Sequence, residues 1–130
     1  MRSVALSIGL LALATLGCTA AAEPEEPRFQ VSGVVTLDGK PLDAGQIIFD
    51  SPEQAAKGIP PVMAEIQAGK YSLSVPEGTK TVKITHMVEV GKEEITGDPI
   101  MKEEIPAKYN RNSKLTAQVD KKENTENFDL

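Results

Sequence analysis

The fold follows from the stretch Val31-Ser32-Gly33-Val34-Val35-Thr36-Leu37-Asp38-Gly39-Lys40-Pro41-Leu42. Apolar and polar residues alternate from Arg28 to Leu37, and this period of two is typical of a β-strand with one buried face. Asp38-Gly39 favours a tight turn, because both residues tolerate the positive φ angles of two-residue hairpin turns. A returning strand is expected over 45–49, with Pro41 at its start, where a missing N–H is tolerated.

The same alternation recurs along the rest of the chain. Further strands are expected over 62–67, 71–75, 79–90 and 115–119, and a polar hairpin over 120–124 leads to a last strand ending at Leu130. The charged segment 91–104 contains Gly97 and Pro99 and is predicted to be a loop. About seven short strands at regular spacing, with no long helix, predict a seven-stranded antiparallel β-sandwich over residues 28–130.

Composition excludes several classes of function. The chain has 130 residues, which fits one domain, and its formal net charge of −5 argues against nucleic acid as a partner. Aromatic residues make up only 4%, so the core is expected to be aliphatic. One His and one Cys provide too few ligands for a zinc site, and no metal or cofactor is expected.

The N-terminus is predicted to be an export signal. Arg2 is followed by an uncharged run of small and apolar residues, Val4 to Gly17, which is shorter than the roughly 20 residues of a spanning helix. Its end, Leu13-Ala14-Thr15-Leu16-Gly17-Cys18, resembles a bacterial lipobox, although Thr15 stands where Leu is usual. The resemblance implies cleavage between Gly17 and Cys18 and lipidation of Cys18. The alternative is an ordinary signal peptide that is cut after Ala20 or Ala22.

Residues 18–27 are predicted to form a flexible tether behind the signal peptide of residues 1–17. The segment is rich in Pro and Glu and has no apolar periodicity, which favours an extended, solvated chain. The protein is therefore expected outside the cytoplasm, held at the cell membrane or the outer membrane by acyl chains on Cys18. No other Cys is present, so only the packed core can hold the domain together.

Several motifs resemble those of the carboxypeptidase regulatory-like domain, which has a transthyretin-like β-sandwich fold. They are 31–42, Gly45-x-Ile47-x-Phe49, Gly69-Lys70-Tyr71-x-Leu73 and Pro76-Glu77-Gly78. The segment 105–110, with Ser113-x-Leu115-Thr116 and the final Asn127-Phe128-Asp129-Leu130, resembles small bacterial lipoproteins that carry this one domain. The resemblance implies a structural or adhesive accessory without an assigned activity. The motifs consist of turn and core residues, so they bear on fold more than on function.

No constellation for catalysis or metal binding stands out. His86 is the single imidazole, no G-x-S-x-G motif is present, and no enzymatic activity is expected. The segment 91–104 and its neighbours hold six carboxylates but lack the spacing of a calcium loop, and Lys92 and Lys102 partly neutralise them. These carboxylates are Glu89, Glu93, Glu94, Asp98, Glu103 and Glu104. A solvated charged loop is the favoured interpretation.

A ligand site is considered around Tyr109, with Lys108 and Asn110 beside it. Sugar binding by sandwiches usually needs an exposed aromatic ring, and the other aromatic residues fall at positions that predict burial. The alternative is a corner tyrosine whose hydroxyl bonds back to the backbone. Tyr71 is expected to be a core residue with its hydroxyl at the rim.

The leading hypothesis is a non-enzymatic, lipid-anchored protein of the cell envelope that serves as a structural or protein-interaction module. Exposed edge strands could pair with another envelope protein, while the anchor holds the domain at the membrane. The alternative is a ligand- or glycan-binding lipoprotein that uses the loops of 91–112.

Overall fold

A computed structural model describes residues 26–130. The predicted signal peptide, the cleavage and lipidation site at Gly17 and Cys18, and the tether up to residue 25 lie outside the described residues. Neither helix in the described part of the chain has the length and apolar character needed to cross a bilayer.

The described chain is all-β, as predicted. It contains eleven strands and two short helices. The elements are β1 (Arg28–Leu37), β2 (Lys40–Pro41), β3 (Ala44–Asp50), α1 (Pro52–Ala56), β4 (Val62–Gln67), β5 (Lys70–Pro76), β6 (Gly78–Thr85), β7 (Met87–Lys92), β8 (Pro99–Glu103), the 3₁₀ helix η1 (Ala107–Tyr109), β9 (Leu115–Val119), β10 (Asn124–Thr125) and β11 (Phe128–Asp129). The number of strands exceeds the predicted seven for four reasons. β2 is a separate two-residue strand, and the strand predicted over 79–90 divides into β6 and β7. β8 lies in the segment predicted to be a loop, and the last predicted strand divides into β10 and β11.

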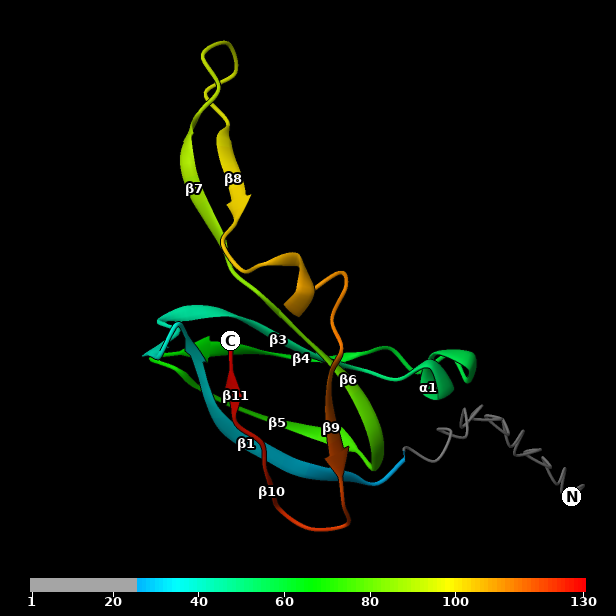
Figure 1. Ribbon diagram of the computed structural model, residues 1–130. Coiled ribbons are helices and arrows are strands. Elements are labelled where there is room, and N and C mark those ends of the chain that lie inside the picture. The colour runs from blue at the N-terminus through cyan, green and yellow to red at the C-terminus, as the bar shows by residue number, and fades with distance from the viewer. Residues whose placement is uncertain (1–25) are drawn as a thin grey trace, which may run out of the picture.

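Nine strands belong to one curled sheet with the order β10-β1-β5-β4-β3-β6-β9, to which β2 and β11 add beside β1. The sheet curls so that β1 and β5 lie opposite β3, β4 and β6 (Figure 1). Its pairs are antiparallel except those of β1 with β10 and with β11, which are parallel. The result is an open sandwich that approaches a half-barrel.

The core fills the inside of this curl, and the predicted alternation is confirmed along the strands that line it. Val31 and Val35 of β1 are fully buried, and the buried residues of β5 are Tyr71, Leu73 and Val75. Tyr71 lies between two other rings, with centroid distances of 6.1 Å to Phe49 and 6.3 Å to Phe128. The remaining buried apolar side chains are aliphatic, namely Leu42, Ile47, Ile66, Val82, Ile84, Ile105, Ala117 and Val119.

The first predicted hairpin is shorter than expected. Asp38 and Gly39 form the turn with φ angles of 52° and 78°, but the returning strand β2 pairs only with Thr36 and Leu37. The physical reason is that β5 already pairs with the same edge of β1 up to Val34. The chain therefore leaves β1 after Pro41, and β3 pairs with β4 and β6 instead.

The predicted polar hairpin over 120–124 is wrong, because β10 pairs with β1 and not with the preceding strand β9. Asn124 makes the change of direction possible. Its side-chain amide donates to the carbonyl oxygens of Asp120 at 3.1 Å and Lys122 at 2.7 Å, and its Oδ1 accepts from the Asp120 N–H at 3.0 Å. The chain thereby crosses from β9, at one edge of the sheet, to β1 near the other.

Residues 124–130, here called the closing segment, lie directly against β1. The Glu126 N–H donates to the Ser32 carbonyl at 2.9 Å, and the Tyr71 hydroxyl donates to the Glu126 carbonyl at 2.6 Å. A Cβ atom on Gly33 would lie only 1.8 Å from that same carbonyl oxygen. Position 33 therefore admits no side chain while the closing segment is in place.

We predict that Gly33→Ala destabilises the domain by about 1–3 kcal/mol, because the clash is with backbone that cannot rotate away. Urea denaturation of the two proteins measures the difference. Gly91→Ala is the matched control, since its new Cβ would meet nothing closer than a side-chain methyl of Ile100 at 4.0 Å. Equal midpoints for wild type and Gly33→Ala would show that the closing segment does not lie over β1.

Candidate interaction site on a projecting hairpin

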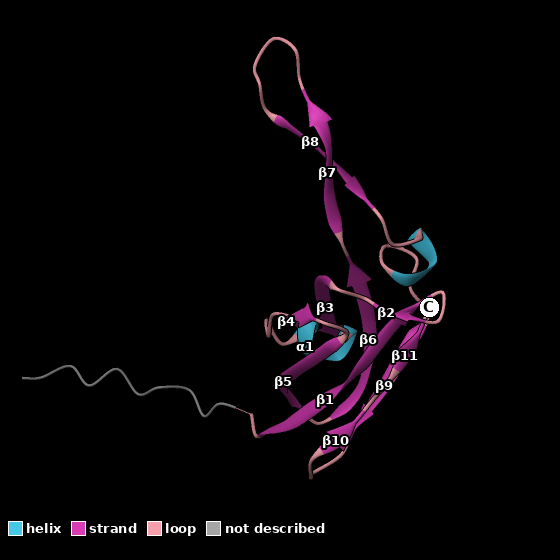
Figure 2. Ribbon diagram, turned by 90° about the vertical axis from the view of Figure 1, so that its left-hand side faces the viewer, coloured by secondary structure: helices cyan, strands magenta, loops and turns pink. Residues whose placement is uncertain are grey.

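The strand predicted over 79–90 is broken at His86. β6 remains in the body, whereas β7 pairs with β8 in a separate two-stranded sheet. This hairpin projects from the body, as two views at right angles show (Figures 1 and 2). The prediction of a loop over 91–104 is therefore wrong at 91–92 and 99–103, which are strand. We call residues 87–103 the arm.

Apolar side chains lie on both faces of the arm. Directly paired residues of an antiparallel ladder share a face, so Glu89 and Met101 lie on one side and Val88 and Lys102 on the other. The register shifts at Val90, which marks a β-bulge in β7. Both faces therefore carry apolar side chains. A ribbon with one face adapted to water would carry only polar side chains on that face.

The arm carries most of the large apolar side chains that the described residues expose. Met87, Val90, Ile100 and Met101 are between 45% and 56% exposed, and Ile95 at the tip is 97% exposed. A two-stranded hairpin by itself is only marginally stable in water. Apolar side chains gathered on such an element are typical of a surface that is covered by a partner.

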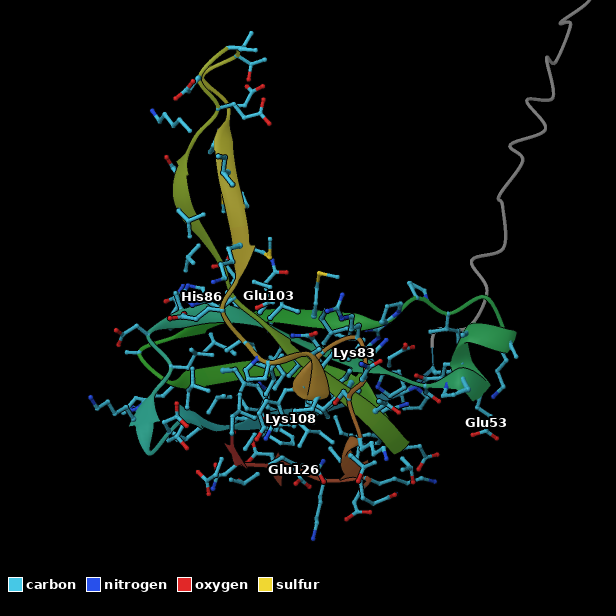
Figure 3. The ribbon with its side chains drawn as sticks, turned by 45° about the horizontal axis from the view of Figure 1, so that its top comes forward. Glu53, Lys83, His86, Glu103, Lys108 and Glu126 are labelled. Atoms are coloured by element: carbon cyan, nitrogen blue, oxygen red, sulfur yellow. The ribbon has the colours of Figure 1, made fainter. Side chains whose placement is uncertain are left out.

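The base of the arm is held by hydrogen bonds to the body. Oε1 of Glu103 accepts from the backbone N–H groups of His86 at 2.8 Å and Ile105 at 2.9 Å. His86 Nδ1 lies 2.5 Å from Oε2 of Glu104, whose N–H also donates to the His86 carbonyl at 2.9 Å. Ile105 is buried in the core directly after these contacts. Figure 3 shows His86 and Glu103 together where the arm leaves the body.

Two hollows flank this base. One, of about 400 Å³, is lined by parts of β3, β4 and β6 and by His86. The other, of about 450 Å³, is lined by Glu103, Glu104, Ile105 and Arg111, among others. The arm and the hollows at its foot together form a broad, uneven surface at one end of the body.

The carboxylates once considered for calcium do not converge. Glu103 and Glu104 are bound at the base, whereas Glu93 and Asp98 lie near the tip, where the Glu93 N–H donates to the Asp98 carbonyl at 2.9 Å. Within residues 26–130, no three His, Cys, Asp or Glu side chains form a group that could hold a metal ion.

The residues considered for ligand binding lie around η1, and their side chains have structural contacts. The Asn110 amide is buried and donates to the carbonyl oxygens of Ile105 at 3.0 Å and Pro106 at 3.3 Å. Tyr109 packs against the core, and Lys108 Nζ lies 4.7 Å from the centroid of its ring. The corner-tyrosine contact is made by Tyr71, whose hydroxyl reaches the Glu126 carbonyl.

Sequence reasoning missed the arm because the charges of 91–104 were given more weight than its apolar residues. Met87-Val88-Glu89-Val90 and Pro99-Ile100-Met101 flank a turn that contains Gly97, whose φ is 75°. Two β-prone segments around a glycine turn are a hairpin signal. What the pattern could not show is that no other element of residues 26–130 covers this hairpin.

Comparisons with known proteins leave the chain without an assigned family. No family model matches it, and no curated protein does. A DUF3823 family protein from Parabacteroides merdae is similar over 81% of this chain and 46% of its own, with 16% identity and a TM-score of 0.43. One from Bacteroides ovatus is similar over 79% and 44%, with 18% identity and a TM-score of 0.40. The chain spans less than half the length of these two proteins.

We predict that Glu103→Ala loosens the base of the arm, because two backbone N–H groups lose their acceptor. Amide hydrogen exchange at His86 and Ile105 should accelerate about tenfold or more, which corresponds to a loss of about 1.4 kcal/mol or more. Glu89→Ala is the control on the same arm, since no hydrogen bond to the Glu89 side chain occurs in the described residues. Unchanged exchange in Glu103→Ala would mean that this carboxylate does not position the arm.

Proposed function

We propose that this protein is an exported, lipid-anchored, non-enzymatic module that uses the arm to bind another protein of the cell envelope. The observation that carries the proposal is the exposure of apolar side chains on both faces of a projecting two-stranded ribbon. The resemblance of its motifs to the carboxypeptidase regulatory-like domain supports an accessory role of this kind.

The arm is suited to pairing through its backbone. A two-stranded sheet has an unpaired edge on each side, and among the described strands β7 and β8 pair only with one another. An extended segment of a partner can add to such an edge by main-chain hydrogen bonds, while apolar side chains supply the contact area. We assign the main apolar contacts with the partner to Val90 and Ile100, and a further contact to Ile95 at the tip.

The charge of the arm indicates the character of its partner. The arm, residues 87–103, holds five carboxylates against two lysines. An acidic ribbon of this kind associates faster with a basic surface, and like charge on the partner would oppose the contact. The partner is therefore expected to present a basic rim around an apolar groove.

The position of the arm relative to the start of β1 supports binding to another envelope protein. β1 begins at the end of the body that lies away from the arm (Figures 1 and 2). Lipidation of Cys18 after cleavage at Gly17 would place that end nearest the membrane, since only a short tether separates them. The arm would then point away from the bilayer and toward other envelope components.

Glycan binding through 91–112 receives less support. A stacking platform needs an open aromatic face, and Tyr109 is packed against the core with Lys108 over its ring. Asn110 is occupied by backbone carbonyls. We therefore favour a protein partner over a sugar.

We predict that a photoreactive residue in place of Ile95 or Ile100 forms a covalent adduct with one envelope protein in intact cells. Met63 is the matched control, because it is 55% exposed on β4 in the body and so offers similar access away from the arm. The adducts are detected by mass shift and identified by peptide mass spectrometry. The same adduct pattern from position 63, or none from the arm, would contradict the proposal.

We also predict that Cys18→Ser transfers the protein from the detergent phase to the aqueous phase on phase partitioning of cells. The reason is that acyl chains on Cys18 supply roughly 0.8 kcal/mol for each buried CH₂ group. Immunoblotting of the two phases measures the distribution. Identical distribution of wild type and variant would exclude the lipid anchor while leaving the arm's role open to the crosslinking test.

A further inference from the structure

A third hollow lies at the other end of β6 from the arm. It has a volume of about 370 Å³ and is lined by residues of α1, by the start of β6 and by Glu26 just before β1. The arm follows β6 at Thr85, whereas this hollow includes Gly78 and Lys80 at its beginning. The proposed function places this end of the body near the membrane but assigns it no binding role.

Lys80 is the unusual residue of the hollow. It is only 2% exposed and shares the inward face of β6 with Val82 and Ile84. Within residues 26–130 its ammonium group makes no ion pair and no hydrogen bond to another side chain or carbonyl. An ammonium group on a mostly buried side chain with no charged partner loses part of its hydration, which disfavours its charged form.

Ser51 lies in the same hollow, and its hydroxyl also lacks a hydrogen-bond partner within residues 26–130. It is 5% exposed and precedes α1, yet its hydroxyl makes no capping bond to the helix. No other hydrogen bond of this hydroxyl occurs in the described part of the chain. Two buried polar side chains that have no partner among residues 26–130 therefore line one hollow.

Both polar groups must face the hollow. Among the described residues, no completely enclosed side-chain nitrogen or oxygen lacks a hydrogen-bond partner. The Lys80 ammonium and the Ser51 hydroxyl are thus open to solvent, and the hollow is the opening that both line. Burial lowers the pKa of Lys80, and the carboxylates of Glu26 and Glu53, which also line the hollow, partly offset this effect.

The carboxylates at the rim differ in whether they have an ion-pair partner. Glu26 lies 3.4 Å from Lys57, and Glu77 lies 3.8 Å from Lys121. Glu53, which projects from α1 at the edge of the body in Figure 3, has no ion-pair partner within residues 26–130. One positive group at the floor and one negative group at the rim therefore remain unpaired.

We propose that this hollow binds a small zwitterion, an amino acid or a short peptide, with its carboxylate on Lys80 and Ser51 and its ammonium group toward Glu53. The carboxylates at the rim would repel a simple anion as it entered. The Lys80 ammonium would repel a simple cation. A molecule with both charges satisfies the two ends together. The volume is within the range of about 300–1,000 Å³ that is usual for small-molecule sites.

The test is an NMR titration of the isotopically labelled full chain with diglycine, acetate and methylammonium as three separate probes. Diglycine should shift the amide signals of Ser51, Thr79 and Lys80 with saturation in the millimolar range. The affinities for acetate and methylammonium should each be lower than that for diglycine by about tenfold or more, because each probe satisfies one end of the hollow only. Equal affinity for acetate and diglycine, or no saturable shift with any probe, would overturn the proposal.

Variants separate the site from the general charge of the surface. Lys80→Met should abolish diglycine binding, and Glu53→Gln should weaken it about tenfold. Lys83→Met is the matched control on the same strand, because Lys83 pairs with Asp50 at 3.2 Å and does not line the hollow.

Lys80→Met is expected to fold with a denaturation midpoint no lower than that of wild type, since methionine suits the apolar face on which Lys80 lies. Diglycine binding that survives in folded Lys80→Met would overturn the proposal. The arm plays no part in this test, so its outcome is independent of the crosslinking experiment.

Discussion

The structure depends on the contact between the closing segment and β1. β1 pairs with β5 and then β2 on one side, and on its other side it pairs with β10 at Val31 and Ser32 and with β11 at Val35 and Thr36. Gly33 and the Tyr71 hydroxyl make this possible, the first by leaving room for the Glu126 carbonyl and the second by binding it. Without this contact the edge of β1 would be open and Phe128 would lose its place in the core.

Closure of the body at β1 leaves β6 as the strand that reaches both proposed sites. Its beginning lines the hollow with Lys80, and its end continues through His86 into the arm. The hydrogen bonds of Glu103 and the burial of Ile105 mark the point at which body becomes arm.

Both regions depart from the pattern of the rest of the molecule, in which apolar side chains are buried and charged side chains are exposed. Lys80 places a charge on an inward face, and the arm places Ile95 and its apolar neighbours in water. Each departure makes the free protein less stable than a conventional residue would. Such departures are concentrated where a ligand or a partner can supply the missing contact, which is why they direct attention to function.

The sequence by itself determined the strands and their buried faces, because a period of two and turn residues such as Asp38-Gly39 are local properties of the chain. The all-β class and the inward sides of β1, β5, β6 and β9 could be predicted for that reason. Only the tertiary structure decided that β10 crosses to β1, that the charged segment forms an uncovered arm, and that Lys80 and Ser51 meet in one hollow. These features arise from pairing between residues far apart in the chain, and alternation along one strand carries no information about which edge, or which empty space, that strand will meet.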